Sequence, residues 1–282
     1  MSRIAVNGVQ LNVEVRGDGP ALLLLHGFTG SSATWTPHLA AWREFRTVAV
    51  DLIGHGDSDC PQNADRYRME RCVDDLTALL DKLDIDRAAV LGYSMGGRVA
   101  LHLALQAPDR LWALVLESAS PGIEDAAERE ERARSAVALA DSIERDGVTA
   151  FIDRWQAQPL FTSQSRLPEG VRDELRNQRL GNKAQGLANS LRGMGAGAQA
   201  SLSSRLQEIG VPVLLLAGED DEKYCRLARS MAAALPCART EIVPDAGHTL
   251  HLEQPDAFAG AVLRFLQESS PGEQRKERMP CH

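Results

Sequence analysis

Cysteine is scarce in this sequence, and its few copies are not arranged for bonding. The 282 residues include five cysteines, an odd number, scattered so that no two form a C-x-x-C pair. This pattern excludes a disulfide framework and a zinc ribbon. It predicts free thiols in a reducing cytoplasm, with no bound zinc.

Excess positive charge and long apolar runs are absent as well. The formal net charge is −8, whereas a nucleic-acid-binding surface needs a basic face, so we expect no nucleic-acid partner. No stretch approaches the roughly 18 consecutive apolar residues of a membrane span, and residues 1–15 lack the apolar core of a signal peptide. We therefore expect a cytoplasmic protein that acts away from membranes. Its composition, 44% apolar and 25% charged, is typical of a globular enzyme.

The sequence does contain an alternation of short apolar runs and helical periodicity. An N-terminal hairpin is predicted because Asn7-Gly8 separates two apolar segments, and Asn-Gly favours a two-residue turn. The later pattern predicts an α/β fold, with a mostly parallel sheet covered on both faces. The predicted strands are residues 21–26, 47–50, 88–91, 114–116, 213–217 and 241–243, and the predicted helices are residues 35–42, 69–83, 97–106, 224–235 and 255–266.

One long stretch breaks this alternation. Residues 121–204 show charged helical segments and no convincing strand. We interpret them as an inserted helical cap over the carboxyl edge of the sheet, where ligands bind in such folds. The predicted core then comprises residues 1–120 and 205–268. Residues 269–282 are polar and charged and are predicted to be a disordered tail.

The most informative motif is Gly92-Tyr93-Ser94-Met95-Gly96, which joins a predicted strand to a predicted helix. A serine between two glycines at such a turn forms a nucleophile elbow, which holds the hydroxyl clear of the sheet in a strained backbone conformation. The glycines have no Cβ, so strand and helix can approach closely. The positive N-terminal end of the helix favours negative charge beside the serine. Ser94 is therefore predicted to be the catalytic oxygen.

A serine of this kind needs a histidine, and the histidine needs a carboxylate that fixes its tautomer. Proteins with this elbow carry the three residues in the order serine, acid, histidine. His248 follows the last predicted strand and Asp221 follows the strand before it, so both are expected at the same sheet edge as Ser94. Asp221 can equally serve as the N-cap of the next helix. Asp220 competes with it, because the sequence does not say which carboxylate points inward.

Two backbone groups complete the predicted catalytic machinery. The segment His26-Gly27-Phe28-Thr29-Gly30 closes the strand at residues 21–26. This position supplies one N–H of an oxyanion hole, here from Phe28, and the residue after the serine, Met95, supplies the other. The glycine-rich turn at residues 54–56 lacks the signatures of a phosphate or dinucleotide loop, and we interpret it as a wall of the pocket.

Together these motifs resemble the α/β-hydrolase superfamily across about residues 3–267. A narrower resemblance is to the menaquinone-pathway family of 2-succinyl-6-hydroxy-2,4-cyclohexadiene-1-carboxylate synthases. Caps vary freely among hydrolases, so the matching cap residues are the more specific part of this resemblance. The residues that carry it are Tyr93, Arg98, Pro121, Gly122, Arg132, Trp155, Arg179 and the stretches 159–161, 186–195 and 218–224.

The resemblance implies a substrate and a reaction. Enzymes of that family eliminate pyruvate from 2-succinyl-5-enolpyruvyl-6-hydroxy-3-cyclohexene-1-carboxylate, a small tricarboxylate, by proton abstraction followed by elimination. No metal or organic cofactor is implied. Arginine suits such a substrate, because its planar fork binds carboxylates in two places at once. The substrate-binding residues implied by the resemblance are Tyr93, Arg98, Arg132, Trp155 and Arg179.

Two other interpretations stay open at this stage. The same triad suits hydrolysis of a carboxylic ester or of a carbon–carbon bond in a diketone, and a cap without arginines would favour that activity. The fold can also serve as a non-catalytic small-molecule receptor, but a receptor does not need the intact triad that this chain carries. The oligomeric state does not follow from the sequence.

Overall fold

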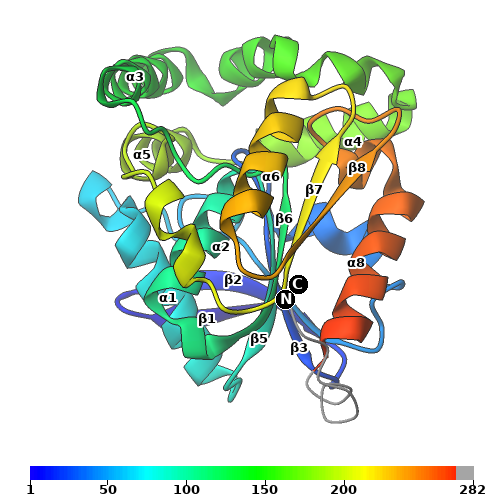
Figure 1. Cartoon of the computed structure of the whole chain (residues 1–282). Helices are drawn as coiled ribbons and strands as arrows, with labels where there is room; N and C mark the ends of the chain where they lie inside the picture. The colour runs from blue at the N-terminus through cyan, green and yellow to red at the C-terminus, as the bar shows by residue number, and fades with distance from the viewer. Residues whose placement is uncertain (271–282) are drawn as a thin grey trace.

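The computed structural model describes residues 1–270 and is built on an eight-stranded sheet (Figure 1). The strand order is β1-β2-β4-β3-β5-β6-β7-β8. Strand β2 pairs antiparallel with β1 and β4, and the other pairings are parallel. The predicted mostly parallel sheet with an antiparallel N-terminal hairpin is confirmed. The strands are β1 (Ser2–Val6), β2 (Val9–Arg16), β3 (Ala21–Leu25), β4 (Arg46–Val50), β5 (Ala88–Tyr93), β6 (Leu111–Glu117), β7 (Val213–Gly218) and β8 (Ala238–Val243).

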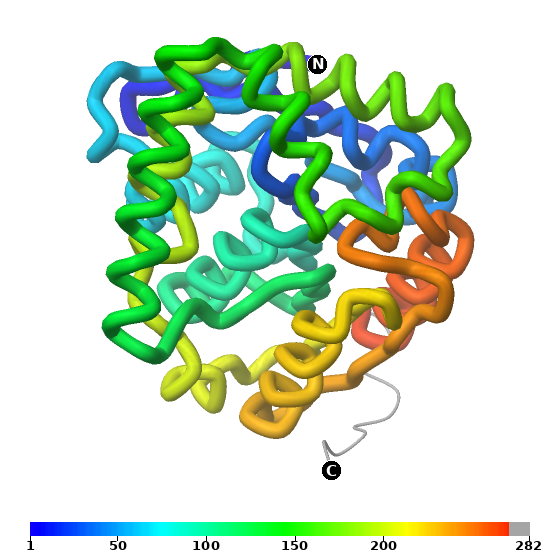
Figure 2. Tube along the Cα trace, turned by 90° about the horizontal axis from the view of Figure 1, so that it is seen from above, coloured from blue at the N-terminus to red at the C-terminus, as the bar shows by residue number. Residues whose placement is uncertain are grey.

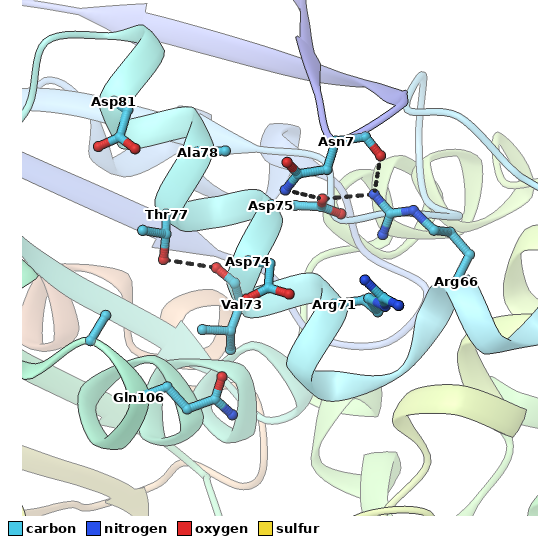
Figure 3. A pocket seen from close by; sticks show the side chains of 11 residues that line it. Asn7, Arg66, Arg71, Val73, Asp74, Asp75, Thr77, Ala78, Asp81 and Gln106 are labelled. Atoms are coloured by element: carbon cyan, nitrogen blue, oxygen red, sulfur yellow. Dashed lines mark hydrogen bonds and ion pairs between the residues drawn. The ribbon is translucent and has the colours of Figure 1, made fainter.

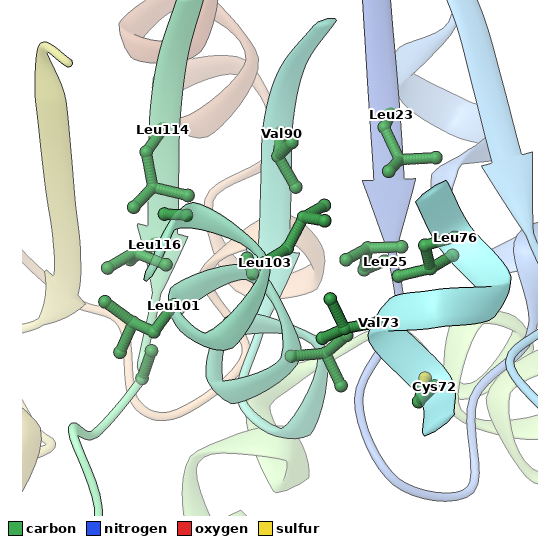
Figure 4. Close-up of a cluster of buried hydrophobic side chains, with 14 of the residues drawn as sticks. Leu23, Leu25, Cys72, Val73, Leu76, Val90, Leu101, Leu103, Leu114 and Leu116 are labelled. Atoms are coloured by element: carbon green, nitrogen blue, oxygen red, sulfur yellow. The ribbon is translucent and has the colours of Figure 1, made fainter. Parts of the chain in front are cut away.

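Helices cover both faces of this sheet. Strand β3 illustrates this, because its successive side chains point to opposite faces of the sheet. Leu23 and Leu25 pack in a core with side chains of α1 and α2 (Figure 4), whereas Leu22 and Leu24 pack on the opposite face with the α8 side. All four leucines are fully buried, which explains why the strand reads as an uninterrupted apolar run. The helices around the sheet are α1 (Met69–Lys82), α2 (Met95–Gln106), α6 (Glu222–Ala234), α7 (Leu250–Glu253) and α8 (Pro255–Ser269), with short 3-10 helices η2 (Ala64–Tyr67), η3 (Pro108–Arg110) and η5 (Ser203–Glu208).

The segment predicted as a helix over residues 35–42 is instead a 3-10 helix, η1 (Ser32–His38). Pro37 lies inside it. Proline lacks the N–H of a helical hydrogen bond and its ring clashes with the preceding turn, so a regular α-helix is disfavoured there. Trp35 and Trp42 are nevertheless fully buried, which accounts for the apolar periodicity that suggested a helix.

Helices without intervening strands connect β6 to β7 within the described chain. Figures 1 and 2 show them above the carboxyl ends of the strands, with α3 and α5 side by side. Gly147, at φ 82°, breaks α3 into two parts. These elements are α3 (Ala126–Gln156), η4 (Pro159–Arg166), α4 (Glu169–Leu180) and α5 (Ala184–Met194). We keep the name cap for residues 121–204, and their separation from the core as a domain stays a prediction.

The C-terminal end of the fold differs from the predicted tail at its first residue. Ser269 is the last residue of α8 and is buried, so the helix runs past the predicted boundary at residue 268. The remaining tail prediction, over residues 271–282, lies outside the described residues.

Asn7 ties the hairpin turn to a partly buried ion pair between η2 and α1 (Figure 3). Asn7 and Gly8 have φ 44° and 84°, as a two-residue hairpin turn requires. Arg66 Nη2 lies 2.7 Å from Asp75 Oδ1, which also accepts a hydrogen bond from Asn7 Nδ2 at 3.1 Å. Burial raises the pKa of Asp75, and its bond to Arg66 offsets part of this effect. These side chains line an open cavity of about 480 Å³ that includes none of the predicted site residues.

The turn between β5 and α2 leaves no room for side chains at its glycines. A Cβ on Gly96 would overlap the carbonyl oxygen of Leu25, which is backbone and has little freedom to shift. We expect Gly96→Ala to lower the free energy of unfolding by about 3 kcal/mol in urea denaturation. Gly170→Ala is the control, because a Cβ there meets no atom in helix α4 and should change stability by less than about 1 kcal/mol. Equal losses in both variants would contradict the steric argument.

Candidate active site

Ser94 connects β5 to α2 in a strained backbone conformation. Its φ of 50° and ψ of −105° lie outside the regions that residues with a side chain favour. Its N–H donates to the Glu117 carbonyl oxygen on β6 at 2.8 Å, and its carbonyl oxygen accepts the Arg98 N–H at 3.1 Å. Such strain persists only where the surroundings fix it, and these bonds do so. The geometry is that of the predicted nucleophile elbow.

His248 lies between Ser94 and Asp221. Its Nε2 is 3.1 Å from Ser94 Oγ, and its Nδ1 is 2.7 Å from Asp221 Oδ2. An ionised carboxylate can only accept, so Nδ1 carries the proton and Nε2 is free to take one from the serine. His248 is 2% exposed and Asp221 is 9% exposed, so the arrangement is shielded from bulk water. The structure thus brings the three predicted catalytic residues together.

The structure also separates the two neighbouring aspartates. Asp221 binds His248 with one carboxylate oxygen and accepts the Tyr224 N–H with the other at 3.3 Å, as the N-cap of α6. Asp220 points elsewhere and pairs with Arg166 at 2.6 Å, with both side chains substantially exposed. Both interpretations of Asp221 therefore apply at once, and Asp220 does not contact the histidine.

A buried histidine fixes the peptide that carries the Phe28 N–H. His26 Nε2 accepts the Leu52 N–H at 3.0 Å, so Nδ1 carries the proton and donates to the Gly27 carbonyl oxygen at 2.7 Å. The Gly30 N–H donates to the same oxygen at 3.0 Å. Burial lowers the pKa of His26 and keeps this ring neutral. In a trans peptide the N–H points opposite to the carbonyl, so the Phe28 N–H is turned away from His26.

The Met95 N–H occupies the first position of α2. The first N–H groups of a helix have no intrahelical partner and carry the positive end of the helix dipole. Phe28 and Met95 thus offer two backbone donors, and their assignment as the oxyanion hole stays a prediction.

Arg98 carries a partly buried guanidinium near a second, exposed arginine, Arg132. Its Nη1 donates to the Met194 carbonyl oxygen and to Gln199 Oε1, each at 2.7 Å. Burial lowers the pKa of Arg98 to about 10, and the neighbouring charge of Arg132 acts in the same direction. Both effects disfavour the cation, so an anion bound here would relieve them.

Arg179 and Trp155 are also left with unused polar groups. Arg179 is 4% exposed, and its guanidinium lies over the Phe161 ring at 5.1 Å. Burial lowers its pKa. The Trp155 N–H is buried without a hydrogen-bond partner, while its ring packs against Phe28 at 5.3 Å. A buried, unpaired donor calls for a ligand or ordered water.

The three site arginines differ from many arginines of the cap. Among the described residues, Arg98, Arg132 and Arg179 have no ion pair, and neither do Arg129 and Arg172, whereas several other cap arginines are matched with carboxylates. Arg192, a weaker candidate from the sequence, belongs to the second group and bridges Asp141 and Glu144. The matched arginines include Arg134, Arg145, Arg154, Arg166, Arg176 and Arg192.

Aromatic rings surround the histidine. The predicted Tyr93 is buried, with its ring 5.6 Å from that of His248, and burial raises its pKa. Tyr224 lies closer still, at 4.5 Å, and was not among the predicted site residues although it follows the acid by three positions. Gln199, which holds Arg98, was also missed, and no sequence signal marks it.

The described residues offer no ligand set for a metal. No group of three or more His, Cys, Asp or Glu side chains among residues 1–270 is placed to hold an ion. In the same part of the chain, no helix is both long enough and apolar enough to cross a membrane.

The fold and the elbow define the class of protein. A family model described as alpha/beta hydrolase fold matches residues 20–255, most of the chain. The chain belongs to the α/β-hydrolase family, which confirms the broader resemblance in its sequence.

Within this family the chain is similar to a particular group of synthases. It is 48% identical over 256 residues to "Putative 2-succinyl-6-hydroxy-2,4-cyclohexadiene-1-carboxylate synthase" of Bacillus subtilis (strain 168), covering 89% of this chain and 93% of that protein. It is 35% identical to the synthase of Serratia proteamaculans (strain 568), with 88% and 94% covered. A solved structure described as MenH from S. aureus has a TM-score of 0.88 and 34% identity, covering 92% of this chain and 98% of that one. The narrower resemblance is confirmed as well.

Replacing the serine tests the elbow. We expect Ser94→Ala to fold normally, because the smaller side chain removes only the hydroxyl that faces His248. Turnover should fall by about 10³-fold or more, as for loss of a triad member elsewhere. Circular dichroism and steady-state kinetics check both points, and near wild-type turnover would remove Ser94 from the mechanism.

The two aspartates give a matched pair of variants. Asn is as good an N-cap as Asp, so Asp221→Asn keeps α6 capped and changes mainly the contact with His248. Its kcat should fall by about 10³–10⁴-fold, because the amide favours the wrong histidine tautomer. Asp220→Asn breaks an exposed ion pair and should change kcat by less than about threefold. The reverse ranking would transfer the acid role to Asp220.

Proposed function

We propose that this chain eliminates pyruvate from 2-succinyl-5-enolpyruvyl-6-hydroxy-3-cyclohexene-1-carboxylate to give 2-succinyl-6-hydroxy-2,4-cyclohexadiene-1-carboxylate. It is a carbon–oxygen lyase of menaquinone biosynthesis on an α/β-hydrolase fold. One observation carries the proposal beyond the family name. A hydrogen-bonded triad lies in a site whose arginines have no carboxylate partners within residues 1–270.

The unpaired arginines suit a substrate with three carboxylates. Arg98, Arg132 and Arg179 would bind these groups, each charge-assisted pair contributing about 1.5–3 kcal/mol. Trp155 would donate its unused N–H to the substrate and pack along the ring. Tyr93 would close the site beside the histidine.

The triad then works as a base. Asp221 keeps the proton on His248 Nδ1, so Nε2 withdraws the hydroxyl proton of Ser94. The serine oxygen removes a proton from the substrate ring, the electrons of that C–H bond form a new ring double bond, and the existing ring double bond shifts toward the carbon that bears the enolpyruvyl group. The C–O bond to the enolpyruvyl group breaks with this electron pair, and the departing enolate takes the proton held on His248 Nε2 to leave as pyruvate. No acyl-enzyme forms.

Charge that develops on the substrate during this step would be stabilised by backbone donors. The Phe28 N–H, whose peptide is fixed by His26, and the Met95 N–H at the start of α2 are the proposed pair. Loss of one such donor typically costs about 3 kcal/mol of transition-state stabilisation.

The cysteines and the net charge bear on where the protein acts and on what it binds. We place the protein in the cytoplasm, supported by free thiols at Cys60, Cys72 and Cys225. Its partner is the small tricarboxylate, with neither nucleic acid nor membrane involved, in keeping with the net charge of −8.

The arginines distinguish a synthase from an ester hydrolase. The purified protein is offered the enolpyruvyl substrate, with pyruvate release as the readout, and separately a neutral aryl ester. Arg132→Ala and Arg179→Ala should each lower kcat/KM for the tricarboxylate by about 10–100-fold. Hydrolysis of the ester needs the triad alone and should barely change.

Arg134→Ala is the matched control, because this α3 arginine is exposed and already paired with Glu130 and Glu131. It should leave both activities within about twofold of wild type. Equal losses on both substrates in the Arg132 and Arg179 variants would mean that these arginines stabilise the fold instead. Rapid ester hydrolysis without pyruvate release would refute the synthase assignment.

A further inference from the structure

Glu253 holds the backbone on both sides of His248. Its Oε2 accepts the Gly247 N–H at 2.8 Å, and its Oε1 accepts the Thr249 N–H at 3.1 Å and the Thr249 hydroxyl at 2.7 Å. The Glu253 side chain is only 3% exposed, so these bonds form in a low-dielectric environment that strengthens them. The proposed mechanism makes no direct use of this carboxylate.

The short helix α7 places the carboxylate where it can reach both N–H groups. The Glu253 N–H donates to the Thr249 carbonyl oxygen at 2.9 Å, so the helix begins at Thr249 and brings the side chain back over its own start. A capping box has the same logic, with an acidic side chain accepting the N-cap N–H. Here the spacing is one residue longer, and the second oxygen extends past His248 to Gly247.

The same network reaches the cap. The Thr249 hydroxyl, which donates to Glu253, accepts a hydrogen bond from Gln164 Nε2 of η4 at 3.1 Å. Arg166, also on η4, lies 3.6 Å from Glu253 and supplies a compensating charge. The loop that carries His248 is therefore fixed from below by α7 and from above by the cap.

We propose that Glu253 is a positioning residue for the triad, which keeps His248 Nε2 within reach of Ser94. The two bonds of the imidazole ring constrain the ring alone, whereas Glu253 constrains the main chain that carries it. A displacement of about 1 Å in a catalytic group can cost about 10²-fold in rate. The inference rests on the role of His248 in the proposed function.

A glutamine at this position is nearly the same size but cannot make the same bonds. Its amide offers one oxygen acceptor, and its NH₂ group would face an N–H donor of Gly247 or Thr249. We expect folded Glu253→Gln to lose about 100-fold in kcat for pyruvate release. KM should stay within about twofold, because Glu253 contacts none of the substrate-binding residues.

Proton NMR supplies a readout that a merely structural role would not move. The Nδ1–H of His248, in its short bond to Asp221, should give a far-downfield resonance in the wild type. In Glu253→Gln this resonance should shift or broaden. Asp256→Asn is the control, because it removes an exposed carboxylate at the start of α8 and should leave kcat and the resonance unchanged.

A folded Glu253→Gln protein with wild-type kcat overturns the proposal, and so does a loss of kcat with an unchanged resonance. If Glu253→Gln does not fold, Thr249→Val replaces it, because this variant removes the hydroxyl and its bonds to Glu253 and Gln164 but keeps both amide bonds to Glu253. Thr249→Val should lower kcat by about fivefold and shift the resonance. The proposal is overturned if kcat or the resonance stays as in the wild type. The resonance is recorded without substrate. Absence of pyruvate from the wild type would therefore refute the proposed function while the Glu253 inference is still tested.

Discussion

The strained turn at Ser94 is the constraint around which the rest of the site is arranged. The turn with the positive φ of Ser94 brings β5 and α2 close together. Gly92 and Gly96 allow this approach, because a Cβ at either position would overlap backbone. The parallel register of β5 and β6 supplies the bond that holds it, from the Ser94 N–H to Glu117. The turn also starts α2, so one backbone feature places both the hydroxyl and the Met95 N–H.

The buried carboxylates and the arginines of the site differ in their partners. The buried carboxylates near the triad are bonded to other groups of the protein. Asp221 binds His248 and caps α6, Glu253 accepts from three donors, and Glu117 Oε1 accepts from the ring and N–H of His251, while Glu117 Oε2 has no partner among the described residues. Within residues 1–270 the site arginines have no carboxylate partner, and burial lowers the pKa of Arg98 and Arg179. The acidic groups thus hold the machinery in place, while the basic groups are left for a ligand.

Much of this arrangement follows from the sequence, for identifiable reasons. The elbow, the placement of Ser94, Asp221 and His248 after the carboxyl ends of parallel strands, and the hairpin depend on local patterns that sequence displays directly. The choice of Asp221 over Asp220 could not be predicted from the sequence, because the two side chains start from adjacent positions and only the packed loop decides their direction. Gln199 acts through a contact across the fold, and Glu253 through local bonds that depend on how its loop folds back, so neither is marked by its sequence neighbourhood. Glu117 did leave a signal, as a lone charge ending the apolar run of β6.

The proposed carboxylate site is formed by both the core and the cap, and this limits how either can change. Arg98 comes from the core helix α2, yet its guanidinium is held by Met194 at the end of α5 and by Gln199 just beyond it. The histidine loop is likewise held from η4 through Gln164 and Arg166. A different cap on the same core would therefore lose more than its own arginines, since it would also release Arg98 and the loop beside His248. Under the proposed function, this dependence would explain how a triad common to hydrolases is committed to one anionic substrate.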